Sequence, residues 1–282
     1  MNKINLLLLF IVLIFPIQLF AESSSVKEAL KHADKAFEAK DYALSMKWNL
    51  KAAAKNNADA ERHIGFLYDR GLGVAQNYQE AMKWYLKAAS KEDAKAEEDI
   101  AWLYKNGFGV NKDYQEAMKW YQKSANNQGY AHSEFGIGLL YYYGHGVTPN
   151  YPEALKWFRM AAAKGEPDSE TTIGDLFAKG QGVAQNYNEA MWWNQKAAQQ
   201  GNAIAERNIG GFYKNGEGVP KDYHKAMYWF LKAAAAEWNI GVLYEKGKGV
   251  FRDRQEAFRW YRKAALDGDE IAQKFIHKNT AE

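Results

Sequence analysis

The sequence predicts an all-α fold, a right-handed α-solenoid of stacked helix-turn-helix units. Two observations carry this prediction. A Gly-x-Gly-Val tetrapeptide recurs six times, and the steps between its first glycines are 36, 37, 36, 36 and 31 residues. Apolar residues on either side of each tetrapeptide follow helical spacing. A fixed period of this size is typical of an array in which each unit is one helix pair and buries a core against its neighbours.

The first 21 residues have the composition of a targeting segment. Lys3 gives a positive start, residues 6–15 form an apolar run, and Pro16 interrupts it before the small residue Ala21. These features predict a secretory signal peptide. The apolar run is shorter than the roughly 20 residues of a membrane span, so we expect cleavage near Ala21; the alternative is an uncleaved anchor. The expected location is periplasmic or secreted, with no stable membrane span after cleavage.

Residues 22–57 predict an N-terminal capping helical hairpin. Ala29 and Phe37 mark one helix by their spacing, and Asp41 precedes a second helix that carries Trp48. The Gly-x-Gly-Val turn is missing between them. Because a solenoid needs an atypical unit at each end, we expect this hairpin to cover the N-terminal end of the array.

Residues 58–266 predict six units of one design. In the first unit, Ala60, Ile64 and Leu67 fall on one face of a helix and are expected in the core. Gly71 ends that helix, because a helix C-terminus often needs one residue at positive φ, which glycine adopts without steric cost. A second helix follows after a short turn.

The start of each second helix has the spacing of a capping box. Asn77 precedes Glu80 by three residues, so the cap side chain is expected to accept from a free backbone N–H while the glutamate reaches back to the cap N–H. The fifth unit has only the cap, Asp222, with Lys225 at the second position. The complete pairs elsewhere are Asp113/Glu116, Asn150/Glu153, Asn186/Glu189 and Asp253/Glu256.

Tryptophan recurs at one position of the second helix. An aromatic ligand platform is one interpretation, but recurrence in register favours a core role, in which each ring is the main buried anchor between units. Lysines that follow in a Lys-Ala-Ala run are expected to complement the helix macrodipole. The tryptophans are Trp48, Trp84, Trp120, Trp157, Trp193, Trp229 and Trp260.

The sixth unit begins irregularly. About five turn residues are missing around residues 233–236, compared with the preceding unit. Either two helices fuse, or the turn is rebuilt by unwinding a helix end, and the sequence leaves both possibilities open. We expect a perturbed superhelical pitch there. Residues 267–282 predict one unpaired helix that caps the C-terminal end.

The repeat resembles Sel1-like repeats, relatives of the tetratricopeptide repeat. The resemblance covers nearly all of the chain after residue 26 and implies a solenoid whose first helices line a concave groove for a protein or peptide partner. The first half of its pattern is matched by Ala205, Ile209, Gly210, Tyr213, Gly216, Gly218 and Val219, and the second half by Glu116, Ala117, Trp120, Tyr121, Lys123 and Ala125.

The positions that would face such a groove lie one, four or five residues from the packing positions. Four of them, Phe66, Trp102, Leu139 and Tyr142, predict an apolar stripe, and contiguous exposed apolar surface usually marks an interaction site. The alternative is that these side chains only fill the inner curve. The partner-binding candidates are Arg62, Phe66, Asp69, Glu98, Trp102, Lys105, Phe135, Leu139 and Tyr142, and their later equivalents are Thr171, Asp175, Ala178, Arg207, Gly211, Lys214, Trp238, Val242 and Glu245.

Composition argues against several functional classes. The net charge is +3 without a basic tail, which gives no nucleic-acid footprint. The chain has no cysteine, which excludes disulfides, thiol nucleophiles and cysteine-bound zinc. Its six histidines are dispersed without metal-ligand spacing. We therefore expect no cofactor, no metal, no nucleic-acid partner and no catalytic residue, and we expect a monomer.

The resulting hypothesis is an exported, non-catalytic scaffold that binds a protein or peptide and is directed at the host or the cell envelope. One alternative is a secreted β-lactamase or penicillin-binding activity, which the resemblance links to a cysteine-rich branch. Ser24 and Lys27 fit the S-x-x-K spacing of such enzymes, but their partner motifs S-D-N and K-T-G are absent. A purely architectural envelope protein is a third possibility.

Overall fold

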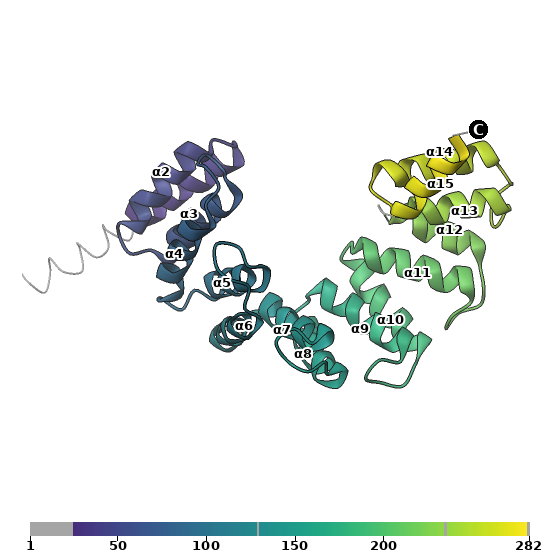
Figure 1. Ribbon diagram of the computed structural model, residues 1–282, viewed down its shortest axis with the longest axis horizontal. Helices are drawn as coiled ribbons and strands as arrows, with labels where there is room; N and C mark the ends of the chain where they lie inside the picture. The colour runs from purple at the N-terminus through teal and green to yellow at the C-terminus, as the bar shows by residue number, and fades with distance from the viewer. Residues whose placement is uncertain (1–24, 129, 234–235, 281–282) are drawn as a thin grey trace, which may run out of the picture. The chain divides into compact units, whose positions relative to one another are not determined.

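A computed structural model describes residues 25–128, 130–233 and 236–280 (Figure 1). The predicted signal segment and its cleavage site lie outside these ranges. Within them all regular structure is helical, as the fold prediction requires. After a helix over residues 25–38, the helices are α2 Tyr42–Ala53, α3 Ala58–Arg70, α4 Tyr78–Ala89, α5 Ala94–Asn106, α6 Tyr114–Gln128, α7 Ala131–Tyr143, α8 Tyr151–Ala163, α9 Pro167–Lys179, α10 Tyr187–Gln199, α11 Ala203–Asn215, α12 Tyr223–Lys232, α13 Glu237–Lys246, α14 Arg254–Leu266 and α15 Glu270–Thr280.

The helices fall into two compact units that divide near residues 140–148. In the first unit α3 packs on α4 and α5 on α6. In the second unit α9 packs on α10, α11 on α12 and α13 on α14. Each of these pairs is a first helix, a glycine turn and a second helix, so the helix-turn-helix prediction is confirmed.

The glycine turn has the geometry that the sequence predicts. Gly71 caps α3 at φ 66°, and Gly73 lies at φ 69°. A Cβ atom on Gly73 would stand 2.7 Å from the backbone nitrogen of Ala43 in α2. The second glycine is therefore needed for close approach to the preceding helix as well as for its φ angle. Both glycines of each later tetrapeptide also have positive φ.

The capping box is only half formed. Asn77 Oδ1 accepts from the Glu80 N–H at 3.0 Å, as expected. The N–H of Asn77, however, already donates to the Tyr68 carbonyl at 2.9 Å across the turn. Glu80 instead accepts from Lys83 Nζ at 2.6 Å. The prediction that Glu80 accepts from the N–H of Asn77 was wrong, because that N–H donates to the Tyr68 carbonyl when the turn folds.

In five of the seven helices that carry the recurring tryptophan, the next residue is a buried tyrosine or phenylalanine; after Trp48 and Trp193 it is a buried asparagine. Tyr85 is 0% exposed and Phe158 and Phe230 are buried to a similar degree, whereas Trp84 is only partly buried. Tyr85 lies against Gly65 of α3, where a Cβ atom would come within 2.6 Å of the ring. Trp84 does pack between units, against the cluster of Met46, Ile64 and Leu67. The interpretation as inter-unit packing holds, but the tryptophan is not the most buried anchor.

A buried glutamate on the first helix pairs with a lysine on the second helix, a feature the sequence analysis missed. Glu170 is 0% exposed, and its Oε1 lies 2.9 Å from Lys196 Nζ. The same ammonium group stands 5.4 Å from the centre of the Trp193 ring. Except for Lys123, which precedes Ser124, the lysines of such pairs belong to the Lys-Ala-Ala runs, so their main partners are a carboxylate and an indole face. The equivalent pairs are Glu97–Lys123, Glu206–Lys232 and Glu237–Lys263.

The irregular sixth junction does not fuse two helices. α12 ends at Lys232 with Ala233 in an extended conformation, and α13 begins at Glu237 without a side-chain cap. Both helices have 10 residues, against 13 in α9, α10 and α11. Both helices are thus shorter at this junction, which excludes their fusion; residues 234–235, between them, lie outside the described ranges. The expected change of superhelical pitch stays a prediction.

Candidate partner-binding surface on the first helices

The predicted partner-binding positions lie on alternate helices, with three on each of α3, α5 and α7. Most of these side chains are partly exposed, but Asp69 is buried at 6% exposure. Tyr142 belongs to the second compact unit, where its hydroxyl donates to Gln181 at 3.3 Å and its ring meets Tyr151. We use the term first-unit surface for the side chains of α3 and α5 among the candidates: Arg62, Phe66, Asp69, Glu98, Trp102 and Lys105.

Phe66 and Trp102 are linked by a cation. The guanidinium carbon of Arg70 stands 5.7 Å from the Phe66 ring centre and 5.9 Å from that of Trp102. Trp102 also packs on Phe108 at 5.1 Å between ring centres. Two of the four residues predicted to form the apolar stripe, Phe66 and Trp102, therefore lie beside one guanidinium group, an arrangement that cation–π attraction favours. Tyr142 belongs to the other compact unit, so a stripe through all four residues stays a prediction.

A cavity of about 240 Å³ opens beside this surface. Phe66 and Arg62 line it, and Phe37 faces Phe66 with 6.1 Å between ring centres. The complete lining is Asp34, Phe37, Ser45, Asn49, Arg62, His63, Phe66 and Leu67. Sequence reasoning found two of these residues and missed the rest, because it treated residues 22–57 only as a cap and did not align their side chains with α3.

Arg62 organises the polar side of the cavity. Its Nη2 lies 3.2 Å from His63 Nε2, and its Nε lies 3.9 Å from Asp93 Oδ1. Burial lowers the pKa of His63, and the adjacent Arg62 charge lowers it further. His63 is therefore neutral at pH 7, so its Nε2 accepts a hydrogen bond from Arg62.

Two carboxyl groups of the first-unit surface, Asp69 and Glu98, and the neighbouring Asp99 have raised pKa values. Burial raises the pKa of Asp99 to about 8, and the neighbouring Glu98 carboxyl contributes to the rise. Burial also raises the pKa values of Glu98 and Asp69. A carboxyl group with a pKa near 8 stays mostly protonated at pH 7, so Asp99 can donate a hydrogen bond there. Within the described residues no cluster of His, Cys, Asp and Glu has the arrangement of a metal site.

The second compact unit has its own hollow of about 280 Å³, which is lined by the later equivalents of the partner-binding candidates. Lys214 donates to Asn239 Oδ1 at 3.1 Å there, and burial lowers the pKa of its ammonium group. Trp238 instead packs on Tyr261, with 4.6 Å between ring centres, and Thr171 is buried. The predicted positions that line the hollow together are Asp175, Ala178, Arg207, Gly211 and Lys214.

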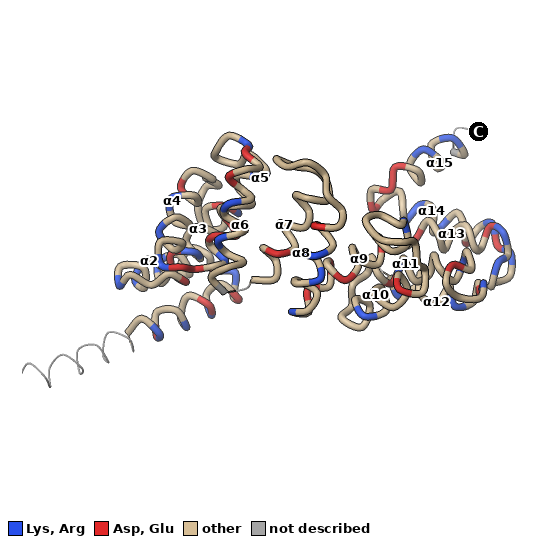
Figure 2. The backbone as a smooth tube through the Cα atoms, turned by 90° about the horizontal axis from the view of Figure 1, so that it is seen from below, with Lys and Arg blue, Asp and Glu red and all other residues tan. Residues whose placement is uncertain are grey.

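The described part of the chain has no helix that combines the length and apolar character of a membrane span. Figure 2 shows basic and acidic residues interspersed along both units. The partner-binding role of the nine candidate residues stays a prediction, since geometry alone does not test it.

Comparison with solved structures identifies similar folds. A Sel1 repeat protein from Oxalobacter formigenes is 34% identical, with a TM-score of 0.79 over 84% of this chain and 99% of the other. The protein c5321, a protective antigen of uropathogenic Escherichia coli strains with an SLR fold, is 30% identical with a TM-score of 0.75. That match covers 93% of this chain but only 58% of c5321. The immunity protein Pa5087 from Pseudomonas aeruginosa, 21% identical with a TM-score of 0.51 over 76% of this chain and 83% of the other, shows the fold alone.

A family profile described as Sel1 repeat matches residues 58–93, 94–128, 131–166, 169–202, 203–237 and 234–269. No curated protein sequence matches the chain. The matches give no support to the penicillin-binding alternative. Six matched repeats and the O. formigenes structure show that the chain belongs to the Sel1 repeat family, whose members generally serve as protein-interaction scaffolds.

Proposed function

We propose that the chain is an exported, non-catalytic scaffold that binds a protein or peptide partner on the first-unit surface. The observation that carries this proposal is the combination of an aromatic surface, Phe66 and Trp102, with an adjoining cavity in the same unit. Aromatic and arginine side chains next to a pocket are the usual anchors of protein interfaces. The second compact unit has its own hollow at the equivalent positions, with the charged side chains Asp175, Arg207 and Lys214 in its lining.

The binding surface is tested by crosslinking in the cell followed by mass spectrometry. The test variant is Phe66→Ala with Trp102→Ala, and the matched control is Leu86→Ala, an exposed side chain on the second helix α4. We expect partners of the wild type to be lost from the test variant and kept by the control. A circular dichroism melt of each protein separates loss of binding from loss of folding.

Two results would argue against this proposal. Partner lists that are identical for the wild type and the double variant would place binding elsewhere. Partners lost from the Leu86→Ala control and kept by the double variant would favour the architectural alternative, in which contacts are made by the second helices.

Export is a separate part of the proposal, supported by the sequence of residues 1–21. The intact mass and the N-terminal sequence of the protein from a periplasmic or culture fraction test it. We expect a chain that begins at Glu22. A protein that retains Met1 and sediments with membranes would show that the segment is an anchor.

A further inference from the structure

Two second helices of the second unit lack a positive charge that the other second helices have. In α10 the residue directly before the recurring tryptophan is Trp192, and in α12 it is Tyr228. Both rings lie on the surface, with exposed fractions of 53% and 62%. Two helices that pack on α11 thus present an aromatic ring in place of a cation. In the other helices this residue is Lys47, Lys83, Lys119, Lys156 or Arg259.

The cation at this position pairs with a glutamate of the same helix. Glu153 Oε1 lies 3.1 Å from Lys156 Nζ in α8. In α14, Glu256 Oε2 lies 3.0 Å from Arg259 Nη1, so the position accepts a guanidinium group as well as an ammonium group. Residues three apart on a helix are neighbours, which brings the two charges together. The pairs of the first unit are Glu80–Lys83 and Glu116–Lys119.

Glu189 of α10 has the carboxylate without the cation. It stands at the place of Glu153 and Glu256, but the residue three positions later is Trp192. Glu189 is exposed, and within residues 25–128, 130–233 and 236–280 its side chain forms no hydrogen bond or ion pair. The chain therefore leaves a negative charge uncompensated beside an exposed indole ring.

The nearest lysine is already engaged elsewhere. Lys196 Nζ stands 5.9 Å from the centre of the Trp192 ring, but it pairs with the buried Glu170 at 2.9 Å. Trp192 meets Trp193 edge to face, with 4.8 Å between ring centres. The Trp192 ring is thus supported by its own helix, and the charge of Lys196 is neutralised by a carboxylate other than Glu189.

A ring face next to a carboxylate suits a guanidinium group. The planar guanidinium of arginine stacks on an aromatic ring and can donate two parallel N–H bonds to a carboxylate, whereas the ammonium group of lysine cannot do both. The first unit contains this combination within the chain. The guanidinium carbon of Arg70 lies 5.7 Å from the Phe66 ring centre, and Arg70 Nε lies 3.8 Å from Asp69 Oδ2.

We propose that Glu189 and Trp192 bind an arginine side chain of a partner protein. The Glu189 carboxylate accepts from the guanidinium N–H groups, and the indole ring covers one face of the guanidinium plane. Tyr228, at the same position of α12, offers a second exposed ring to the segment that carries the arginine. This surface lies on second helices, so it is an interaction site separate from the first-unit surface.

The test is an NMR titration of the purified, ¹⁵N-labelled protein with a hexa-arginine peptide. The indole N–H signal of Trp192 is identified by its absence from the spectrum of Trp192→Lys. Hexa-arginine should shift this signal at millimolar concentration, and hexa-citrulline, which has a similar shape without the charge, should not. Hexa-lysine should bind roughly threefold more weakly, because its ammonium groups do not stack. No shift with hexa-arginine, or equal binding of hexa-arginine and hexa-lysine, would overturn the proposal.

A matched pair of variants separates the site from net charge. Glu189→Gln should weaken hexa-arginine binding by about three- to fivefold, the effect of one exposed ion pair. Glu153→Gln removes the same charge from α8, where Lys156 already pairs with the glutamate, and should leave the binding unchanged. Equal effects of the two substitutions would mean that the peptide responds only to net charge, which would contradict the proposal.

A second pair of variants tests the ring. Trp192→Lys gives α10 the residue type of the other helices and should abolish the binding, followed here by the signals of the peptide. Leu231→Lys adds the same charge at an exposed position of α12 and should keep it. Loss of binding in both variants would indicate charge repulsion alone and would refute the role of the ring.

A second copy of the chain is the other possible occupant, and the same spectra detect it. A Trp192 signal that moves with protein concentration in the absence of peptide would show that two copies meet at this surface, against the proposal. Crosslinking with the Phe66 and Trp102 variants tests the first-unit surface separately, so the two proposals can fail independently.

Discussion

At the scale of single residues, side chains at equivalent positions of different repeats have different surroundings. Asn49 and Asn194 share a position and one hydrogen bond, yet only Asn194 has a partner for its Oδ1. Asp99 stands at the place of His63 and Asn208, and burial raises its pKa to about 8. Such differences arise because each neighbouring helix contributes a different side chain to the same local frame.

Asp99 should make stability depend on pH. Burial raises its pKa from the usual 3.8 to about 8, so between about pH 4 and pH 8 the folded protein holds a proton that the unfolded chain has released. Below about pH 4 both states are protonated, and Asp99 does not lower the free energy of unfolding. As the pH rises from about 4 to about 8, Asp99 lowers the free energy of unfolding by up to about 1.4 kcal/mol per pH unit. We expect Asp99→Asn to be less sensitive to pH in urea unfolding across this window.

The sign of this effect distinguishes a buried acid from a paired one. If the wild type gains stability between pH 4 and pH 8 relative to Asp99→Asn, the folded carboxylate is stabilised by a cation and the burial argument is wrong. Urea midpoints measured at three or four pH values are sufficient.

Gly73 should be far less replaceable than a glycine with similar φ in open space. A Cβ atom at Gly73 would meet the Ala43 nitrogen at 2.7 Å, whereas Gly201, at φ 79°, has no atom within 4 Å. Gly201→Ala should cost roughly 1–2 kcal/mol, the usual penalty for positive φ. Gly73→Ala carries the same penalty and a backbone clash, so we expect a clearly larger loss in thermal or urea unfolding. Equal losses would show that α2 yields to the added methyl group.

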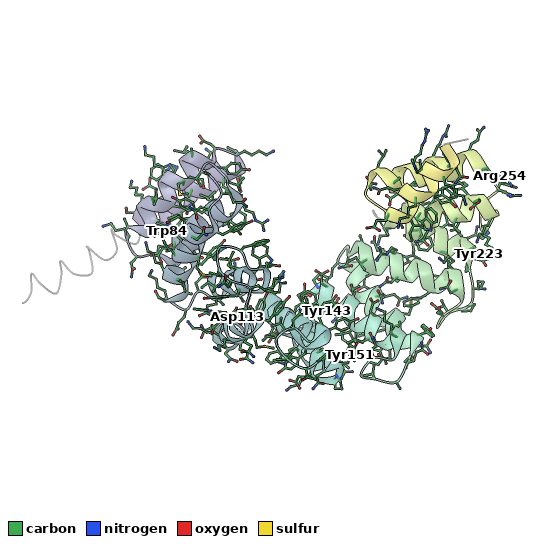
Figure 3. The ribbon with its side chains drawn as sticks, viewed as in Figure 1. Trp84, Asp113, Tyr143, Tyr151, Tyr223 and Arg254 are labelled. Carbon is green, nitrogen blue, oxygen red and sulfur yellow. The ribbon has the colours of Figure 1, made fainter. Side chains whose placement is uncertain are left out.

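At the scale of helices, the second helices take part in two types of ion pair, one within the helix and one to a neighbouring helix. Exposed pairs such as Glu80–Lys83 link residues of one helix three positions apart. Pairs such as Glu170–Lys196 connect a buried carboxylate of one helix to a lysine of the next. Trp84, labelled in Figure 3, represents the aromatic position on which such lysines lie.

The buried pair should matter much more than the exposed one. Lys196→Met leaves Glu170 buried without its cation, which is strongly destabilising when a buried pair is broken; because Lys196 is 39% exposed, we expect about 2 kcal/mol. Lys83→Met removes only a surface pair, expected to contribute about 0.5 kcal/mol. Urea unfolding of both variants measures the difference. Similar losses for the two would show that water screens the Glu170 carboxylate.

The cap of each second helix should depend on one of its two predicted residues. Asn77→Ala removes the bond to the Glu80 N–H and should cost about 1 kcal/mol. Glu80→Gln should change stability by only a few tenths of a kcal/mol, because Glu80 binds an exposed lysine and not the cap N–H. A loss from Glu80→Gln as large as that from Asn77→Ala would indicate that the complete capping box forms in solution.

At the scale of the whole molecule, stability should be local. Each helix packs mainly on its neighbours in sequence, and in repeat arrays the free energy is close to a sum of unit and interface terms. The last helix, α15, covers α13 and α14 through Phe275, whose ring centre lies 4.7 Å from that of Tyr261 and 5.8 Å from that of Trp238. The predicted C-terminal cap is therefore one removable element.

Deletion of residues 267–282 should lower the local stability of α13 and α14 only, because α15 packs on these two helices. Hydrogen exchange should show faster exchange in α13 and α14, while α3 and α4 of the first unit keep their protection. The control is Phe251→Ala, a side chain that is 97% exposed and should change neither region. Loss of protection in α3 and α4 after the deletion would mean that the array unfolds as one cooperative body.

The sequence by itself determined the features that repeat. The period, the helix pair, the glycine turn and the asparagine or aspartate cap all follow from local backbone chemistry, which is the same in every unit. It also placed Arg62 and Phe66 on one helix face, because helical spacing alone decides which residues share a face.

Only the tertiary structure decided which partners these repeated residues find. In the folded protein the Asn77 N–H donates to the Tyr68 carbonyl, and Lys196 pairs with the buried Glu170. The Asn49 Oδ1 has no partner among the described residues, whereas the Oδ1 of Asn194 accepts from Asn208. These contacts join residues from different helices. The first two recur in other units, whereas the surroundings of Asn49 and Asn194 differ because the neighbouring helix carries a different side chain. No local pattern encodes them, because their energy depends on which neighbouring helix brings a donor, an acceptor or a charge into a space closed to water.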